Sequence, residues 1–242
     1  MIEPAIASIG RRRLLAAGAA MMAAGCAGPR SLGTYEVAEV PAPSWRVGDR
    51  WTYRRTDFYT RLDAGTVTRE VVSVAPNGIR IVTRTVDGRL LDDATYSPPG
   101  VELSGNLSED SASVAGTLRP PFERYAFPLV SGKQWQQSIT RTDAGGFRSP
   151  LWARTRVEGW ESIKAGNRDV RAIVIRRDFN LGPKDSFRGD LLRNELEWYA
   201  PDLRGPARMQ IEEWYYEQRN TIFAELMPGA RYLYELVSFN PG

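Results

Sequence analysis

Carboxylates are the side chains of this sequence with the clearest capacity for chemistry. The chain of 242 residues has no histidine and one cysteine, Cys26, which removes the commonest general base and every Ser-His-Asp or Cys-His arrangement. Two carboxyl groups can still cleave a glycosidic bond when they flank it. The candidate acids are Glu195, Glu197, Glu212, Glu213 and Glu217.

Glu195 and Glu197 lie two residues apart, so a strand would carry both on one face about 7 Å apart. The surrounding segment alternates, with Leu192, Asn194, Leu196 and Trp198 on one face and Arg193, Glu195 and Glu197 on the other. This period of two is typical of a sheet with one face in water. We interpret the charged face as solvated surface and predict that the protein is not an enzyme. A carboxylate-dependent glycoside hydrolase is the distant alternative.

Neither a metal, a cofactor nor a nucleic acid is expected as a partner. Without histidine and with one cysteine, no zinc cluster can form, and Gly145-Gly146 and Gly182-Pro183-Lys184 lack the glycine spacing of nucleotide-binding loops. The pI is near 9.1, but acids are interspersed with arginines and no run of like charge follows Arg13. Nucleic-acid binding is therefore not predicted.

Aromatic side chains supply a second kind of candidate site. Large aromatic faces can bind an acyl chain or a sugar, although such residues also build cores. The candidates for lining a ligand site on the concave side of a curved sheet are Trp51, Trp135, Trp160, Trp198 and Tyr199.

Strands must position these residues. Short segments rich in Val, Ile, Thr, Tyr and Trp recur between turn clusters, which predicts a mainly β fold built on a curved antiparallel sheet, as a half-barrel or open β-barrel. We expect a single domain over 45–242, with 105–127 as a loop or a short helix near 109–115. The predicted strands are 50–56, 66–74, 79–86, 101–104, 134–140, 151–160, 170–179, 192–199, 207–216 and 232–239.

Local signals add detail to this sheet. Asn77-Gly78 and Asp87-Gly88 predict hairpin turns, because both pairs accept positive φ. The alternation breaks near 211–216, where a β-bulge is one explanation. Gly48-Asp49-Arg50-Trp51 and Gly132-Lys133-Gln134-Trp135 share the spacing Gly-x-x-Trp. They indicate either a duplicated β-meander or two independent strands that each begin with a turn glycine followed by a tryptophan.

The N-terminal segment has the layout of an export signal. Arg11, Arg12 and Arg13 precede twelve uncharged residues, 14–25, and Cys26 follows them. This uncharged run is too short to span a bilayer. Ala23-Ala24-Gly25-Cys26 resembles the bacterial lipobox, and the segment around Arg11 and Arg12 resembles a twin-arginine signal. This resemblance to bacterial lipoproteins implies that 1–25 is removed, that Cys26 is acylated, and that 26–44 is a flexible tether. The alternative is an ordinary secretory signal cut at an Ala-x-Ala site.

The remaining chain is similar to uncharacterised β-rich domain families of secreted bacterial proteins. The similarity lies in Phe127-Pro128-Leu129, in the segment 157–166, in Trp198-Tyr199-Ala200-Pro201 and in the segment 234–239. It implies a curved antiparallel sheet and no established activity. Ala27 after the cysteine implies the outer membrane by the same resemblance. We therefore expect an envelope lipoprotein, facing the periplasm, that binds an apolar ligand or a partner protein. A purely structural interaction module without a pocket is the alternative.

Overall fold

Twelve antiparallel strands close into a barrel in the computed structural model, which describes residues 38–108, 116–183, 188–220 and 223–242. Each strand pairs with its neighbours along the chain, and β1 pairs with β12 to close the sheet. The prediction of a mainly β, curved antiparallel fold is confirmed. Closure leaves no unpaired sheet edge, which is how barrels avoid edge-to-edge aggregation.

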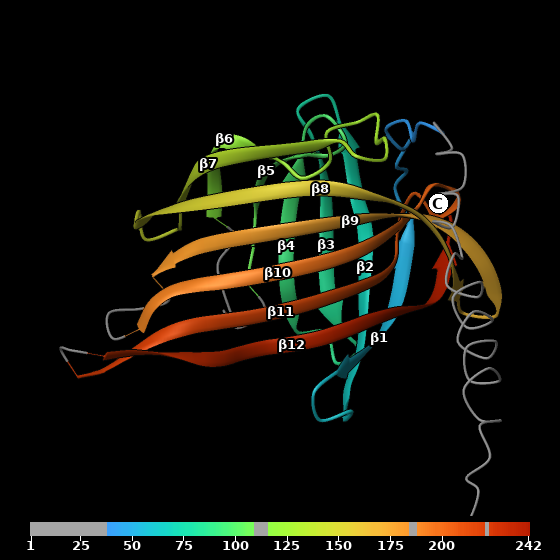
Figure 1. Ribbon diagram of the computed structural model, residues 1–242. Helices are drawn as coiled ribbons and strands as arrows, with labels where there is room; N and C mark the ends of the chain where they lie inside the picture. Colours follow the sequence, from blue (N-terminus) through green and yellow to red (C-terminus); the bar gives the residue numbers. More distant parts are fainter. Residues whose placement is uncertain (1–37, 109–115, 184–187, 221–222) are drawn as a thin grey trace, which may run out of the picture. The chain divides into compact units, whose positions relative to one another are not determined.

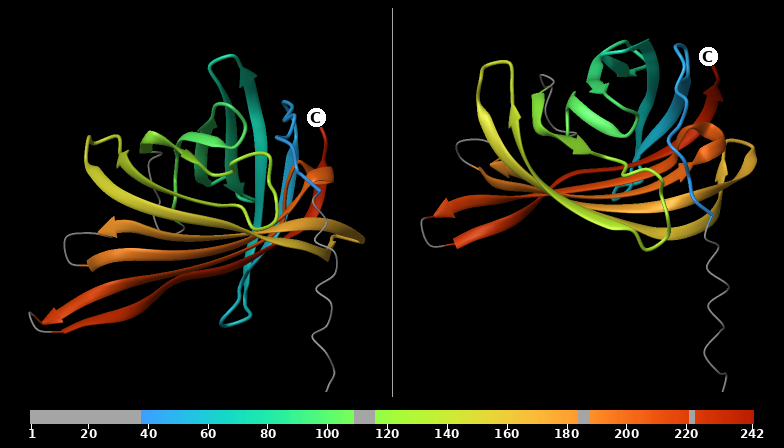
Figure 2. Two further views of the ribbon diagram at one scale, coloured as in Figure 1. Left: turned by 45° about the horizontal axis from the view of Figure 1, so that its top comes forward. Right: turned by 90° about the horizontal axis from the view of Figure 1, so that it is seen from above.

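The strand bounds show that the second half of the barrel is built from longer strands than the first. The strands are β1 (Arg50–Asp57), β2 (Asp63–Ala75), β3 (Gly78–Thr85), β4 (Leu90–Tyr96), β5 (Val101–Gly105), β6 (Gly116–Glu123), β7 (Gln134–Thr142), β8 (Arg148–Ala165), β9 (Arg168–Pro183), β10 (Arg188–Ala200), β11 (Gly205–Asn220) and β12 (Phe223–Asn240). A short 3₁₀ helix, η1 (Pro201–Leu203), joins β10 to β11. In Figure 1, β8 to β12 run side by side, and β2 to β4 cross behind them. Figure 2 shows how strongly the long strands curve.

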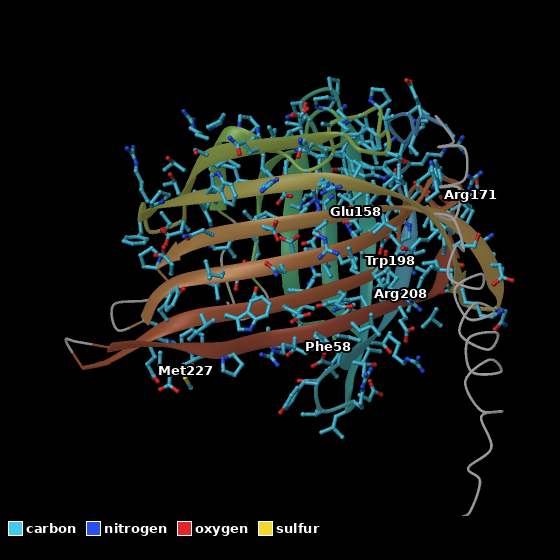
Figure 3. The ribbon with its side chains drawn as sticks, in the orientation of Figure 1. Phe58, Glu158, Arg171, Trp198, Arg208 and Met227 are labelled. Carbon is cyan, nitrogen blue, oxygen red and sulfur yellow. The ribbon has the colours of Figure 1, made fainter. Side chains whose placement is uncertain are left out.

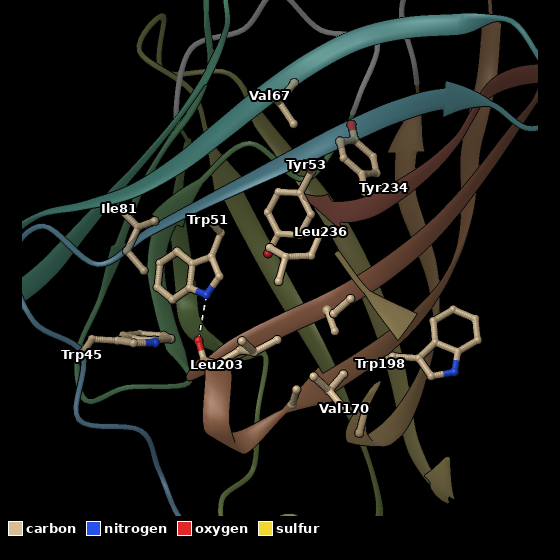
Figure 4. Packing of buried hydrophobic residues seen from close by; sticks show 14 of the residues in the cluster. Trp45, Trp51, Tyr53, Val67, Ile81, Val170, Trp198, Leu203, Tyr234 and Leu236 are labelled. Atoms are coloured by element: carbon tan, nitrogen blue, oxygen red, sulfur yellow. Dashed lines mark hydrogen bonds between the residues drawn. The ribbon is translucent and has the colours of Figure 1, made fainter. Parts of the chain in front are cut away.

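The buried apolar side chains of the described residues form three clusters. The largest gathers Trp51, Tyr53, Ile81, Leu203 and Leu236 with other buried residues (Figure 4). A second contains Tyr125, Ile175 and Tyr199, and a third contains Phe122, Ile139 and Phe179. Inward residues alternate with outward ones along much of the sheet, as a barrel requires, while residues 172–175 of β9 and 197–200 of β10 are buried on both faces.

The two Gly-x-x-Trp motifs occupy equivalent places. Gly48 and Gly132 lie in turns that precede β1 and β7, with φ of 90° and 85°, a conformation that glycine adopts without steric cost. The indole N–H of Trp51 donates to a backbone carbonyl at 2.8 Å, and that of Trp135 does the same at 2.8 Å. Each motif therefore opens a run of six strands with the same local geometry.

The strands that pair back to these motifs are also alike. The carbonyl of Val71 in β2 accepts from the N–H of Gly48 at 2.9 Å, and that of Val157 in β8 accepts from Gly132 at 2.8 Å. The register of β2 shifts directly after Val71, and that of β8 shifts directly after Val157. A shared bulge beyond the shared tryptophan favours the duplicated meander over two independent strand starts.

Several local predictions need correction. The stretch 105–127 was expected to be irregular, but it contains β6, and β4 was missed entirely. The turn between β2 and β3 is centred on Pro76-Asn77, because Ala75 pairs with Gly78. Pro76 holds a negative φ, so no primed turn forms there. The bulge predicted near 211–216 is confirmed by a register shift after Glu212, and the helix expected near 109–115 lies outside the described residues.

The segment before β1 contributes to the packing. Val40, which the sequence places in the tether, is 2% exposed and exchanges two backbone hydrogen bonds of 2.9 Å with Leu129. The indole N–H of Trp45 donates to the carbonyl of Arg204 at 2.7 Å. The packed part of the chain therefore includes Val40.

Candidate functional site

The charged face of β10 points into the barrel. Arg193, Glu195 and Glu197 are 6%, 1% and 0% exposed, while Leu192 and Leu196 on the opposite face are half-buried. The interpretation of this face as solvated surface is wrong. Alternation separates two faces of a strand but does not say which one is inside. A twelve-stranded barrel has room for long charged side chains wherever each charge finds a partner.

Six side chains make a buried ion-pair network inside the barrel. They are Arg124 from the segment after β6, Arg177 on β9, Arg193, Glu195 and Glu197 on β10, and Glu213 on β11. Arg177 is central, because its Nη1 donates to Glu195 Oε1 and to Glu197 Oε2, both at 2.7 Å. Its neighbours on the same face of β9, Ile175 and Phe179, belong to the second and third apolar clusters. The network therefore lies between these two clusters.

The remaining arginines complete the network. Nη2 of Arg124 donates to Oε1 of Glu195, and Nη2 of Arg193 donates to Oε2 of the same residue at 2.9 Å. Nη1 of Arg193 also lies 3.3 Å from Oε1 of Glu213. Three guanidiniums thus surround the carboxylate of Glu195. Buried charges are tolerated when they are paired and hydrogen-bonded in this way.

Electrostatics keep Glu195 ionised. Burial favours the neutral carboxyl, but the positive charges of Arg124, Arg177 and Arg193 outweigh it and hold the pKa of Glu195 below its usual range. Burial and the charge of Glu197 raise the pKa of Tyr125 to about 12. Its phenol therefore keeps the proton that it donates to Glu197 Oε1 at 2.7 Å.

A second buried acid lies beside this network. Glu102 on β5 is 2% exposed, and its Oε2 accepts from the hydroxyl of Tyr96 at 3.4 Å. Burial raises the pKa of Glu102 to about 7, although the charge of Arg124 opposes this and that of Asp92 adds to it. Burial also raises the pKa of Asp92. The carboxyl of Glu102 therefore titrates near neutral pH inside the barrel.

The two acids that share a strand face are fully engaged by protein partners. Glu195 and Glu197 accept hydrogen bonds from guanidiniums and from a phenol, and neither reaches solvent. Nη1 of Arg177 bonds to both carboxylates and so occupies the place between them. Within the described ranges, no group of three His, Cys, Asp or Glu residues is arranged to hold a metal ion.

The five predicted ligand-lining aromatics are divided between two clusters. Trp51 and Trp198 belong to the largest cluster, Tyr199 belongs to the second, and Trp135 and Trp160 pack against the second. Trp198 lies on the outer face of β10, where its indole N–H donates to Glu161 at 2.7 Å. Arg208 covers it with its guanidinium 5.5 Å from the ring centre (Figure 3). The structure does not bring the five together, and a ligand-lining role for them stays a prediction.

Two hollows lie near the ends of the long strands instead. An inner pocket of about 220 Å³ opens at the inner face of β7 to β10. Four leucines line it, Leu107, Leu151, Leu181 and Leu191, together with polar residues that include Arg141 and Arg188. An outer groove of about 410 Å³ lies over the same strands, around Trp152. Leu151, Gly182 and Pro183 contribute to both hollows.

Sequence reasoning named Glu195, Glu197 and Glu213 as candidate acids but missed their burial and their arginine partners. Arg124 and Arg177 come from two distant parts of the chain, and nothing in the local sequence of Arg124 marks it as buried. One usable signal was present: on β9, Arg177 stands between inward Ile175 and Phe179, so period two places it on the apolar face. Cys26, Arg11 and Arg12 lie outside the described residues.

Comparisons with known proteins give only distant resemblances. No family model and no curated protein matches this chain. A candidate lipoprotein from Parabacteroides distasonis has 12% identity and a TM-score of 0.47 over 83% of this chain and 99% of its own. A candidate exported protein with a YmcC-like fold from Bacteroides fragilis has 14% identity and a TM-score of 0.45 over 84% of this chain and 100% of its own.

The hypothetical lipoprotein YmcC from Escherichia coli is also similar, with 9% identity and a TM-score of 0.41 over 83% of this chain and 92% of its own. Because every TM-score is below 0.5, we draw no functional conclusion from these proteins. No helix in the described part of the chain is long and apolar enough to cross a membrane.

Proposed function

We propose that this protein is a bacterial envelope lipoprotein, acylated on Cys26, whose barrel binds an apolar ligand in the inner pocket and catalyses no reaction. The observation that carries this proposal is the leucine lining of that pocket. Ligand sites combine apolar surface with polar groups that orient the ligand, and the inner pocket places four leucines beside two arginines and two serines. Its volume of about 220 Å³ suits part of an acyl chain rather than a whole lipid.

Apolar contact is the interaction that this pocket offers. Leu151, Leu181 and Leu191 project from three neighbouring strands, and Leu107 follows β5. Moving an apolar ligand surface from water into contact with them contributes about 25 cal/mol per Å². The two arginines and two serines of the lining give the pocket a polar side where a ligand's head group can be solvated.

The buried ion-pair network supports a non-catalytic barrel. An acid catalyst must exchange protons with a substrate that it touches, whereas Glu195 and Glu197 are enclosed by protein donors. The network stabilises one arrangement of β9, β10 and β11. We infer that it is part of the scaffold that shapes the inner pocket.

The place of the protein is inferred from its N-terminal sequence. Three arginines, an apolar run and Ala23-Ala24-Gly25-Cys26 resemble a signal for export followed by acylation, with Ala23 at a position where leucine is usual. Each buried acyl CH₂ contributes about 0.8 kcal/mol, so two or three chains hold a globular domain on a membrane where one chain binds only reversibly.

Binding is tested with the mature chain and N-phenyl-1-naphthylamine, a neutral probe that fluoresces in apolar sites. We expect saturable binding that Leu181→Gln weakens about tenfold, or 1.4 kcal/mol, because an amide replaces one of the lining leucines. Leu226→Gln changes an exposed leucine on β12 and should leave binding unchanged. Circular dichroism confirms that both variants fold. Absence of probe binding to the wild type would overturn the pocket assignment and favour a purely structural module.

A further inference from the structure

We propose that the outer groove is a carbohydrate-binding site. The groove lies on the outward face of β7, β8 and β9 and has a volume of about 410 Å³. Its exposed tryptophan, Trp152, does not line the inner pocket, so this inference does not depend on a ligand there. Its lining combines one exposed indole, three prolines and a set of polar side chains, which is the chemistry that a sugar ring requires.

Trp152 provides the stacking surface. Of the seven tryptophans, all of which lie in the described ranges, it is the one that is classed as exposed, at 38%. Trp152 stands on β8 directly opposite Ser138 on β7 and Asn180 on β9. Residues paired across strands have Cβ atoms about 5 Å apart. The indole is therefore flanked on both sides by short polar side chains that leave its ring accessible.

The polar groups of the groove are oriented and in part unused. Nδ2 of Asn180 donates to Asp190 at 2.8 Å, and its Oδ1 accepts from the N–H of Gly182 at 2.9 Å. These two bonds fix the carboxylate of Asp190 at the groove. Within the described part of the chain, the side chains of Ser138, Thr140 and Arg119 have no hydrogen-bonding partner. Hydrogen-bond donors and acceptors around the indole are therefore available to a ligand.

The groove is also stiff. Pro120, Pro150 and Pro183 line it, and each proline fixes its own φ. A second constraint is the close approach of Gly182, where an added Cβ would lie 2.7 Å from the carbonyl of Pro150. A preformed site loses little conformational entropy when it binds a ligand.

These features favour a sugar over other ligands. A pyranose ring has a face of C–H groups that packs on an indole and a rim of hydroxyls that bond to carboxylate, hydroxyl and guanidinium groups. A purely apolar ligand would cover the guanidinium of Arg119 and the hydroxyls of Ser138 and Thr140 without bonding to them. The lining contains one arginine and one aspartate and so carries no net charge, which matches an uncharged saccharide. A polyanion such as a nucleic acid would need a basic surface.

The proposal is tested on an array of bacterial and plant oligosaccharides, followed by titration calorimetry with the best oligosaccharide. We expect binding that Trp152→Ala weakens at least tenfold and that Trp152→Phe largely retains, because an aromatic face remains. The double variant Ser138→Ala, Thr140→Val should weaken binding about threefold. Phe147→Ala removes another exposed aromatic of the same hairpin that does not line the groove, and it should have no effect.

The outcomes separate this inference from the proposed function. Binding of N-phenyl-1-naphthylamine should be the same in Trp152→Ala as in the wild type, since the probe occupies the inner pocket. No binding to any saccharide of the array, or equal binding by the wild type and Trp152→Ala, would overturn the carbohydrate assignment. Neither result would affect the proposed apolar pocket, which the binding of N-phenyl-1-naphthylamine tests separately.

Discussion

Arg177 is the residue on which the interior depends most. It is 0% exposed, it bonds to both Glu195 and Glu197 at 2.7 Å, and its Nη2 donates to the carbonyl of Arg124 at 3.0 Å. Its guanidinium also lies 4.9 Å from the ring centre of Tyr125. We predict that Arg177→Met lowers the free energy of unfolding by about 3–5 kcal/mol, because two buried carboxylates lose a charge partner. Urea denaturation measures this loss.

An exposed ion pair supplies the matched comparison. Arg80 and Asp93 are joined by a salt bridge of 2.5 Å, but half of the Arg80 side chain is exposed. Arg80→Met should cost no more than about 1 kcal/mol, since surface pairs contribute little. If both variants lose the same free energy of unfolding, the buried network is not a stabilising unit.

Glu102 makes stability depend on pH. Burial raises its pKa in the folded protein to about 7, and the charges of Asp92 and Arg124 act in opposite directions on it. In the unfolded chain the same carboxyl titrates near its ordinary value of about 4.3. The folded state therefore holds the proton more tightly. The contribution of the protonated Glu102 carboxyl to the free energy of unfolding is fully present below about pH 4.3 and is lost as the pH rises to 7.

Glu102→Gln tests this linkage, because the amide stays neutral at every pH. We predict that the variant gains about 3 kcal/mol relative to the wild type between pH 4 and pH 8, as the wild type becomes charged beside Tyr96. Denaturation with urea at several pH values measures the difference. Parallel stability curves for the two proteins would contradict the assignment of a near-neutral pKa to Glu102.

At the scale of the strand, β6 and β7 pair in an unusual way. Their ladder covers only Thr117 to Arg119 on β6, because the following Pro120 and Pro121 have no N–H to donate. A side chain of β7 takes the place of the missing ladder: Oε1 of Gln137 accepts from the N–H of Glu123 at 2.8 Å. The strand pair therefore depends on an amide that the barrel directs inward.

Gln137→Ala should lower the free energy of unfolding by about 1–3 kcal/mol, since it leaves a backbone N–H without a partner. Gln136 is the neighbouring residue on the outward face and is exposed. Gln136→Ala should change stability by less than about 0.5 kcal/mol. Thermal unfolding of both variants measures the contrast, and equal melting temperatures would show that β6 needs no such support.

The same elements show how far a sequence pattern can be followed. Ten strands were predictable, because β-branched and aromatic residues alternate between turn residues. β6 was missed since Pro120-Pro121 argue against a strand, and β4 was missed since Asp92-Asp93 interrupt its apolar pattern. On β10 the period of two was right, but the charged face was predicted to lie in water and instead points into the barrel. Only the partners from β9 and β11 show that the charges are compensated.

For the whole barrel, the candidate site was less predictable than the fold. The inner pocket and the outer groove each combine side chains from several strands, and that assembly depends on register and closure rather than on any local motif. The repeated Gly-x-x-Trp motif is a local signal that the structure places at two equivalent positions, because Val71 and Val157 pair back to it in the same way. The duplicated meander that it suggests stays a prediction.

The location of the molecule rests on one residue outside the described ranges. If Cys26 is acylated, the whole barrel stays on a membrane, because two or three acyl chains contribute about 0.8 kcal/mol for each buried CH₂. We predict that the wild type fractionates with membranes, incorporates radiolabelled palmitate and has an intact mass raised by the acyl groups. Cys26→Ala should appear unlabelled in the soluble fraction or remain uncleaved.

A second variant separates anchoring from export. Arg11→Lys combined with Arg12→Lys alters the twin-arginine pair and keeps the charge, so a twin-arginine route predicts a precursor that accumulates in the cytoplasm with Cys26 unmodified. If this variant is still exported and labelled, the protein uses the general secretory route, and the lipid anchor stands. If the wild type carries an unmodified Cys26 in its native host, the anchor proposal is wrong, whichever route delivers the protein.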